Sequence, residues 1–406
     1  MPASVFRKGL NLKHAVAGAL AEDYHSSLVD EIKADGFRWS RGRLVVHLAK
    51  EFGFCYGVDR AVDYAYQTRE RFPDRRVFLT GEIIHNPQVN NRLREAGVAF
   101  LTDPGQSIAQ INGDDVVILP AFGVTVGELQ ELSRRDCTLV DTTCGSVLNV
   151  WKNVKRYTRD GFTAVIHGKV HHEETRATAS QALNAPDGRY LVVLDRDEAS
   201  IACDFIRGRV SGKQFQKAFR HACSPGFDPE VDLRKVGLAN QTTMLMSESL
   251  EIGTMFREAL IDRYGQESLG DHYRAFETIC SATQDRQDAV QDLLRAGTYD
   301  LAVVIGGYNS SNTRNLARIC ADRLPTFHIA DADCLVSDRD IRHRPPAGAL
   351  ATGAGGPSGE EVVTYDWFPK TGPVTVAVTA GASTPDSIVG DVINRLTGFA
   401  ASVPGE

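Results

Sequence analysis

The sequence predicts an α/β protein with mostly parallel sheets, and three features of the chain agree on this. Short runs rich in valine, isoleucine and leucine recur along it, each with the length of a buried strand. Amphipathic stretches with apolar residues at helical spacing separate these runs. Glycine or polar residues follow the runs, as expected where a strand gives way to a loop. This alternation indicates right-handed crossovers between parallel strands.

Eight apolar runs are the predicted strands, in chain order. They are RLVVHLA (43–49), RVFLTG (76–81), DVVILP (115–120), CTLVD (137–141), TAVIHG (163–168), KVGLAN (235–240), LAVVIGG (301–307) and VTVAVTAG (374–381). The predicted helices between them include VDRAVDYAYQTRERF, SESLEIGTMFREALIDRY and DRQDAVQDLLRAG. Three segments fall outside the alternation and are expected to be extensions or insertions: residues 1–42, about 196–234, and 340–372.

Length and charge limit the classes of function. The chain has 406 residues, 42% of them hydrophobic, which is enough for two or three domains. Its net charge of -7, without a long run of lysine and arginine, argues against nucleic acid or an anionic membrane as the main partner. No run of about 18 apolar residues could span a bilayer, and no secretory signal is visible, so we expect a cytoplasmic protein.

Three of the eight cysteines are candidate metal ligands. Ligands of open parallel sheets bind beyond the carboxyl ends of the strands, and Cys55 in GFCYG and Cys144 in TCG lie in such turns. Cys280 directly precedes a helical pattern. Backbone N–H groups and the helix dipole lower the pKa of a thiol in such a position and favour metal ligation. The other five cysteines are expected to be ordinary core residues: Cys137, Cys203, Cys223, Cys320 and Cys334.

Two histidines, His85 in EIIHN and His172 in KVHHEE, also follow predicted strands. Hydroxyl and amide side chains accompany them in equivalent loops: Asn86, Thr242, Ser310, Ser311, Asn312 and Ser383. Such donors suit a phosphate or diphosphate bound without a Walker-type loop, and no GxxxxGK motif occurs in the chain. Each of them alone could equally be a turn residue or a helix cap.

Glu174, two residues after His172, is a candidate proton donor. If its loop faces the ligand, burial would raise the pKa of this carboxyl into the range needed for proton delivery. A solvated acid within HHEET is the alternative, and the residues alone leave both open.

Taken together, the strand-end motifs resemble those of the 4-hydroxy-3-methylbut-2-enyl diphosphate reductase family (LytB/IspH), in the same order. The motifs are GFCYGVDRA, GEIIHNPQV, DTTC, HHEETRAT, NQTT, the TIC of residues 278–280, GGYNSSNT and VTAGASTPD. They extend from about residue 44 to about residue 396. The amino-terminal extension and the two insertions are similar to those of longer cyanobacterial and plant-type members.

The resemblance implies three α/β lobes in a pseudo-threefold arrangement around a central iron–sulfur cluster. On this basis we expect an extension (1–43), a first lobe (44–144) whose strand 44–55 packs with the third lobe, a second lobe (145–278, insertion about 196–234), a third lobe (279–396, insertion about 340–372) and a tail (397–406).

The resemblance also implies the chemistry. One 4Fe–4S cluster per chain would be held by Cys55, Cys144 and Cys280, leaving one iron open to the substrate hydroxyl. The reaction would be the two-electron reductive dehydroxylation of the allylic diphosphate to isopentenyl and dimethylallyl diphosphates, the last step of the methylerythritol phosphate pathway, with ferredoxin or flavodoxin as electron donor. Site residues implied for the diphosphate are His85, His172, Ser310, Ser311, Asn312 and Ser383. Glu174 would relay protons to the leaving hydroxyl, and Thr242 would orient that hydroxyl and its water network.

One position departs from the family pattern. Many bacterial members carry a histidine in an AHGV motif that reaches the diphosphate, whereas this chain reads AFGV with Phe122. We expect a neighbouring cation or hydroxyl, such as Lys169, to compensate.

Two other classes of protein remain as alternatives. A non-catalytic iron–sulfur sensor or scaffold would need the cysteines but not Glu174 or Thr242. A zinc hydrolase would use His171, His172 and Glu174, although HHEE is not the HExxH motif.

Overall fold

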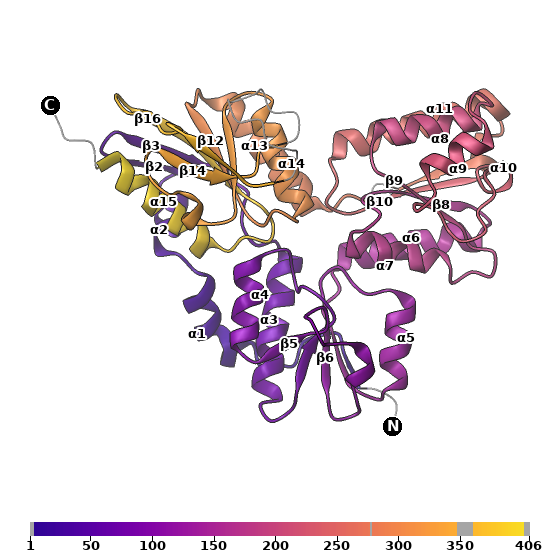
Figure 1. Cartoon of the computed structure of the whole chain (residues 1–406), viewed down its shortest axis with the longest axis horizontal. Helices are drawn as coiled ribbons and strands as arrows, with labels where there is room; N and C mark the ends of the chain where they lie inside the picture. The colour runs from indigo at the N-terminus through magenta and orange to yellow at the C-terminus, as the bar shows by residue number, and fades with distance from the viewer. Residues whose placement is uncertain (1–3, 277, 347–359, 402–406) are drawn as a thin grey trace. The chain divides into compact units, whose positions relative to one another are not determined.

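The computed structural model of the chain describes residues 4–276, 278–346 and 360–401. Strands and helices alternate along it (Figure 1), and three mostly parallel sheets carry helices on their faces, so the predicted α/β class is confirmed. The chain divides into two compact units. Unit 1 comprises the start of the chain up to Gly9, Phe72–Ile83 and Val98–Cys280; unit 2 comprises Leu10–Arg71, Ile84–Gly97 and the chain from Ser281 onward.

Unit 1 contains the first sheet, whose five strands are ordered β1-β7-β6-β4-β5 and pair in parallel. Its strands are β1 (Val5–Phe6), β4 (Val77–Leu79), β5 (Val98–Phe100), β6 (Val116–Leu119) and β7 (Thr138–Asp141). The 3-10 turn Ile108–Gln110 and α5 (Val126–Arg134) accompany the sheet. Thr125 and Glu128 form a capping box that fixes the start of α5.

Unit 1 also contains the second sheet, ordered β11-β10-β8-β9 and again parallel. Its strands are β8 (Thr163–His167), β9 (Tyr190–Val193), β10 (Val236–Asn240) and β11 (Tyr273–Ala275). Its helices are α6 (Gly145–Arg159), α7 (Glu173–Ala182), α8 (Arg196–Ile206), α9 (Gly212–Ala218), α10 (Pro229–Asp232), α11 (Met246–Tyr264) and α12 (Leu269–His272). Figure 1 shows α6 and α7 on one face of this sheet and α8 and α11 on the other.

One glycine lets α6 lie close to the second sheet. A Cβ atom at Gly237 would lie 2.4 Å from the ring of Tyr157, so a side chain there would displace the helix. The Tyr157 hydroxyl donates to the carbonyl of Leu238 at 3.0 Å. This packing sets the position of α6, which begins directly after Cys144.

Unit 2 contains the third sheet, ordered β13-β12-β16-β3-β2. Of the described strands of this sheet, only β2 runs antiparallel to its neighbour, and the others pair in parallel. Its strands are β2 (Arg38–Arg41), β3 (Leu44–Leu48), β12 (Leu301–Ile305), β13 (Thr326–Ile329) and β16 (Val374–Ala380). The helices of unit 2 are α1 (Lys13–Tyr24), α2 (Ser27–Ala34), α3 (Tyr56–Arg71), α4 (Pro87–Glu95), α13 (Ser281–Ala296), α14 (Ser311–Ala321) and α15 (Asp386–Ala401), with a 3-10 turn at Ala332–Cys334.

The segments expected to be extensions or insertions have structure of their own. Val29 and Ile32 of α2 are fully buried in the core beside β3 and α15, so the first 42 residues help to cover the third sheet. Residues 196–234 form α8, α9 and α10, and Phe215 lies in the core of unit 1. The last expected insertion contributes a hairpin of β14 (Asp340–His343) and β15 (Val362–Tyr365). Among the described residues, no helix is both long and apolar enough to cross a membrane.

Candidate functional site

The predicted site residues fall into two groups, one in each unit. Unit 1 carries Cys144, His172, Glu174, Thr242 and Cys280, and unit 2 carries Cys55, His85, Ser310, Ser311, Asn312 and Ser383. Within each unit, hydrogen bonds connect loops that follow different strands.

In unit 1, Glu174 and Thr242 are directly bonded. Glu174 is 2% exposed, and its Oε1 accepts the backbone N–H of Thr242 at 2.6 Å. The Thr242 hydroxyl donates to Oε2 of the same carboxylate at 3.0 Å. Of the two alternatives that the sequence left open, the structure therefore selects a buried acid over a solvated one. Glu174 is placed where it can exchange a proton with a neighbouring hydroxyl.

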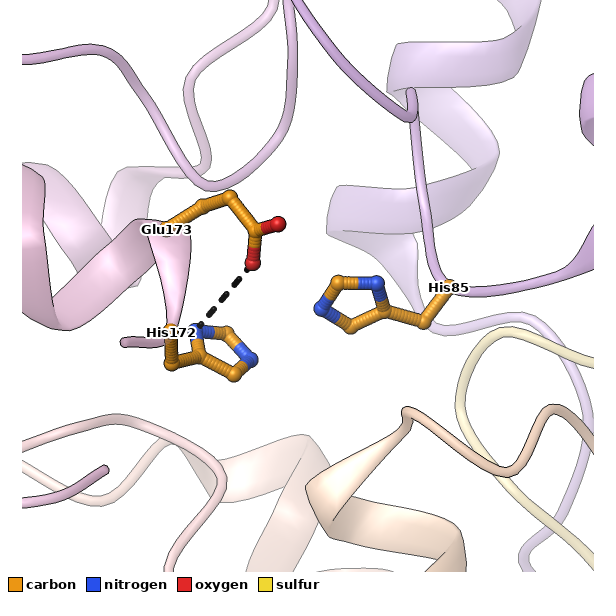
Figure 2. A group of neighbouring side chains, drawn as sticks. All are labelled: His85, His172 and Glu173. Atoms are coloured by element: carbon orange, nitrogen blue, oxygen red, sulfur yellow. Dashed lines mark ion pairs between the residues drawn. The ribbon is translucent and has the colours of Figure 1, made fainter. Parts of the chain in front are cut away.

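The start of α7 fixes the orientation of Glu174. His172 caps the helix, and its Nδ1 accepts the backbone N–H of Glu174 at 3.1 Å. Figure 2 shows His172 beside Glu173, whose Oε2 lies 4.0 Å from the same Nδ1. The side chain of Glu173 is 49% exposed, whereas Glu174 is 2% exposed, so the two consecutive acids face different surroundings. Figure 2 also draws His85, which belongs to the other unit.

The loop after β10 connects Thr242 to the third candidate cysteine. The backbone N–H of Cys280 donates to the carbonyl of Thr242 at 3.2 Å. The N–H of Asn240, two residues earlier, donates to the hydroxyl of Thr278 at 2.7 Å. Hydrogen bonds thus connect the NQTT and TIC motifs. Through Thr242, Glu174 is linked to Cys280.

Cys144 and His172 both adjoin the AFGV motif. The N–H of Cys144 donates to the carbonyl of Ala121 at 3.0 Å. The ring of Phe122 meets the ring of His172 edge to face, with centroids 5.6 Å apart and an interplanar angle of 80°. Gly123 has φ +76°, and a Cβ atom there would lie 2.4 Å from Trp151. The sequence did not indicate that Phe122 packs directly against a predicted ligand-binding histidine.

In unit 2, Ser383 connects two of the predicted loops. Its hydroxyl donates to the carbonyl of His85 at 3.2 Å, and its own carbonyl accepts the side-chain amide of Asn86 at 2.9 Å. A Cβ atom at Gly307 would lie 2.3 Å from the carbonyl oxygen of His85, so the GGYNSSNT loop also approaches here. The three loops lead into α4, α14 and α15.

Asn312 and Cys55 lie on either side of the same turn. Oδ1 of Asn312 accepts the N–H of Ala382 at 2.9 Å, and the carbonyl of Ala382 accepts the N–H of Cys55 at 3.2 Å. Nδ2 of Asn312 is buried and has no hydrogen-bond partner in the part of the chain that the structure describes. Ser310 caps α14, with its hydroxyl accepting the N–H of Thr313 at 3.2 Å. Ser311 follows it and is 3% exposed.

The three candidate cysteines share a position that the others lack. Cys55, Cys144 and Cys280 are half-buried, and each immediately precedes a helix, α3, α6 or α13. Burial raises the pKa of Cys203 and Cys320 to about 12 and raises the pKa of Cys137 and Cys223 as well, which keeps these thiols protonated. Cys334 is buried. Each of Cys55, Cys144 and Cys280 thus has, taken by itself, the position that favours a metal-ligating thiolate.

Two residues that organise the site were not predicted. The Gln241 side chain accepts the N–H of Lys169 and the hydroxyl of Thr175, each at 3.1 Å, and thereby joins the loops after β8 and β10. Tyr308, in GGYNSSNT, donates its hydroxyl to Glu361 at 2.8 Å. The only signal in the sequence was that both lie within motifs at strand ends.

Comparisons with known proteins show the family of the chain. The family model described as LytB protein matches residues 46–397. A protein of Synechococcus is 48% identical over 393 residues, covering 96% of this chain and 94% of its own length. Proteins of Thermosynechococcus vestitus (45% identical, 96% of this chain and 93% of that protein) and Gloeobacter violaceus (48%, 96% and 91%) match similarly. All three are named 4-hydroxy-3-methylbut-2-enyl diphosphate reductase.

Two solved structures are also similar. One is of (E)-4-hydroxy-3-methyl-but-2-enyl diphosphate reductase, described as the terminal enzyme of the non-mevalonate pathway; it is 26% identical, with a TM-score of 0.51 over 87% of this chain and 99% of that one. The other is the E-1-hydroxy-2-methyl-but-2-enyl-4-diphosphate reductase of Plasmodium falciparum, 19% identical, with a TM-score of 0.59 over 87% of each chain. The second likeness shows the fold alone.

Proposed function

The chain belongs to the LytB protein family, and we propose that it reduces (E)-4-hydroxy-3-methylbut-2-enyl diphosphate to isopentenyl and dimethylallyl diphosphates. This is the activity for which its relatives are named, and it is the last step of the non-mevalonate isoprenoid pathway. The observation that carries the proposal is the buried Glu174 carboxylate bonded to Thr242, whose carbonyl accepts the N–H of Cys280. Hydrogen bonds through Thr242 thus connect the proposed proton donor with a proposed metal ligand.

Cys55, Cys144 and Cys280 would hold a 4Fe–4S cluster, three thiolates for four irons. Their half-buried positions before helices support this, because helix amino termini stabilise thiolates. When bound, such a cluster supplies electrons singly and an iron without a protein ligand, which can take the substrate hydroxyl. A sensor or scaffold would need the same cysteines but would not need the Glu174–Thr242 pair.

Glu174 would hold the proton that the leaving hydroxyl needs. Loss of that hydroxyl as water consumes one proton, and a second proton ends on the allyl carbon. Oε2 of Glu174 lies 3.0 Å from the Thr242 hydroxyl, which can pass a proton onward as it receives one from the carboxyl. The same hydroxyl can orient the substrate oxygen, and this gives Thr242 its role in binding.

The diphosphate would be bound by residues of both groups: His85, His172, Ser310, Ser311, Asn312 and Ser383. In unit 2, the buried amide nitrogen of Asn312 has no partner among the described residues and can donate to a phosphate oxygen. Ser310 caps α14, so the first N–H groups of this helix also favour an anion. We propose that Lys169, half-buried in the turn after β8, offsets the donor that Phe122 does not provide.

The electron donor would be a ferredoxin or flavodoxin, in the cytoplasm. We propose that the chain forms three lobes with the boundaries predicted above, in a pseudo-threefold arrangement around the cluster. Support comes from the three separate sheets, each with its own strand-end loops.

An anaerobic assay tests the proposed function. The purified chain is supplied with a reduced low-potential donor and the allylic diphosphate, and five-carbon diphosphates are measured. We expect both isopentenyl and dimethylallyl diphosphates, in step with oxidation of the donor. A chain that binds iron and sulfide but leaves the substrate unchanged would instead support the sensor or scaffold.

A further inference from the structure

Helix α6 carries a concentration of positive charge on a chain that is negative as a whole. Its sequence, GSVLNVWKNVKRYTR, contains four basic residues and no acidic one, whereas the net charge of the chain is -7. The basic residues are Lys152, Lys155, Arg156 and Arg159. Their spacing of three and four residues places them along one stripe of the helix.

This stripe faces away from the sheet. Val150, Val154 and Tyr157 are buried against the second sheet, while Lys152, Lys155 and Arg159 are exposed. Leu148, one turn before Lys152, is an exposed apolar residue at 45%. The stripe therefore combines cations with an exposed apolar side chain.

An exposed aromatic residue adjoins the stripe. Phe276 is 42% exposed, and the guanidinium of Arg156 lies 4.3 Å from the centroid of its ring. The nearby acid Asp160 is already paired with Arg274 at 2.5 Å and with Arg159 at 3.2 Å. We call the surface formed by Leu148, Lys152, Lys155, Arg156, Arg159 and Phe276 the α6 face.

Beyond the carboxyl end of the stripe, the positive charge continues around a cavity of about 740 Å³. Five basic side chains line it: Lys155, Arg159, Arg189, Arg234 and Lys235. The acidic side chains in its lining are Asp187 and Asp232, and Asp232 lies 3.6 Å from Arg189. The cavity thus extends the positive region and gives a partner a recess to enter.

The α6 face adjoins two of the three proposed cluster ligands. Helix α6 begins directly after Cys144, and the N–H of Leu148 donates to the carbonyl of Cys144 at 3.0 Å. At a rise of 1.5 Å per residue, Lys152 lies about 12 Å along the helix from Cys144. Phe276 precedes Cys280 by four residues. A partner seated here would contact the segments that lead to both thiols.

We propose that the α6 face docks an acidic one-electron carrier protein; this rests on the proposed function. A standard protein–protein interface covers about 800 Å² on each partner and is roughly 30 Å across. An interface of that size would extend along α6 from Leu148 to the cavity beyond Arg159. Cations around an apolar centre attract an acidic partner from a distance and hold it in one orientation. The net negative charge of the rest of the chain repels the same partner elsewhere.

The test compares two double substitutions that remove the same charge from unit 1. One is Lys152→Gln with Lys155→Gln on α6. The control is Lys213→Gln with Lys217→Gln on the exposed side of α9. Turnover of the holoenzyme is measured with a reduced, strongly acidic plant-type ferredoxin and, separately, with reduced methyl viologen, a small cationic dye that does not require a docking surface.

We expect the α6 substitutions to raise the KM for the ferredoxin about tenfold at low ionic strength and to change the methyl viologen rate less than about twofold. Added salt should raise the wild-type KM toward that of the variant, and the α9 control should behave as wild type. An unchanged KM, an equal rise in the control, or an equal loss with methyl viologen would overturn the proposal. If the wild type did not turn over with methyl viologen, that result would instead contradict the proposed function. The docking proposal would then be tested by measuring ferredoxin binding to both variants by titration calorimetry.

Discussion

The carboxylate of Glu174 accepts two hydrogen bonds from Thr242, one from the backbone N–H at 2.6 Å and one from the hydroxyl at 3.0 Å. These residues are 68 positions apart in the chain: Glu174 lies in the first turn of α7, the helix after β8, and Thr242 lies in the loop after the neighbouring strand β10. A buried carboxylate costs free energy unless its oxygens are bonded, and Thr242 satisfies both of them. The Glu174–Thr242 pair therefore has no unbonded carboxylate oxygen.

Replacing Glu174 by Gln should remove the proton donor and keep the shape of the side chain. We expect turnover with the allylic diphosphate to fall at least about a hundredfold, because proton transfer by a positioned acid contributes that much. The visible spectrum of the bound cluster should not change. Glu173→Gln is the matched control, since Glu173 occupies the same helix turn but is half-exposed, and it should retain activity within about threefold. Equal losses in both variants would count against Glu174 as the donor.

Phe122→Leu should weaken substrate binding without affecting the chemical step. The ring of Phe122 holds the ring of His172 edge to face, and such contacts contribute about 0.5–1.5 kcal/mol. We expect the KM for the diphosphate to rise by roughly twofold to tenfold, with kcat nearly unchanged. Phe227→Leu, a substitution in the ring pair with Phe215, serves as the control. A KM identical to that of the wild type would show that Phe122 does not position His172.

Tyr308→Phe should loosen the GGYNSSNT loop. The Tyr308 hydroxyl donates to Glu361 at 2.8 Å, and Arg344 both stacks on the ring at 4.6 Å and donates to the Tyr308 carbonyl. Burial raises the pKa of Tyr308, so its hydroxyl remains a donor at neutral pH. Loss of this hydrogen bond should lower the free energy of unfolding by about 1 kcal/mol and raise the KM for substrate. In urea titrations, the control Tyr365→Phe, at an exposed site, should have the unfolding midpoint of the wild type. A Tyr308→Phe variant with that same midpoint would contradict the expectation.

Stability should fall as the pH is lowered from about 6.5 to about 4. Burial lowers the pKa of His328 to about 4, and its Nε2 donates to the carbonyl of Gly306 at 3.0 Å. In this pH window the unfolded chain binds a proton that the folded chain does not, so the contribution of His328 is complete above 6.5 and is lost on acidification. The shift from 6.5 to about 4 corresponds to roughly 3 kcal/mol.

His328→Gln checks this assignment. Its unfolding midpoint in urea should depend less on pH between about 7 and about 5 than that of the wild type. His343, whose pKa burial also lowers to about 4, should supply part of the remaining slope. A wild-type protein that becomes more stable on acidification, or a variant with the full wild-type slope, would be inconsistent with a buried neutral His328.

The central strands were predictable from the sequence because strands covered on both faces consist of continuous apolar residues. Each of the eight predicted runs contains an observed strand: β3, β4, β6, β7, β8, β10, β12 and β16. The strands that the sequence did not indicate are shorter or lie at sheet edges. β5 is the three residues VAF, and β11 reads YRA, of which two are polar. Whether these segments form strands depends on pairing with a neighbouring strand and not on their own composition.

The sequence identified candidate site residues but not the contacts between them. Strand-end positions and motif order selected Glu174 and Thr242, yet no sequence pattern fixes a hydrogen bond across 68 residues. The contact of Phe122 with His172 was missed because an aromatic residue at a strand end has no characteristic partner. Glu361 lies in the segment 340–372, which the sequence predicts as an insertion, and no motif there indicates its contact with Tyr308.

The central claim is that Cys55, Cys144 and Cys280 hold an iron–sulfur cluster, and its most direct test is the iron and labile sulfide content of three anaerobically purified proteins. Wild type should be brown, with about four irons and four sulfides per chain. Cys223→Ser, a substitution of another half-buried cysteine of unit 1, should be the same, whereas Cys144→Ser should lose most of its iron and colour. A colourless wild type that is fully active, or equal loss of iron in both variants, would contradict the account.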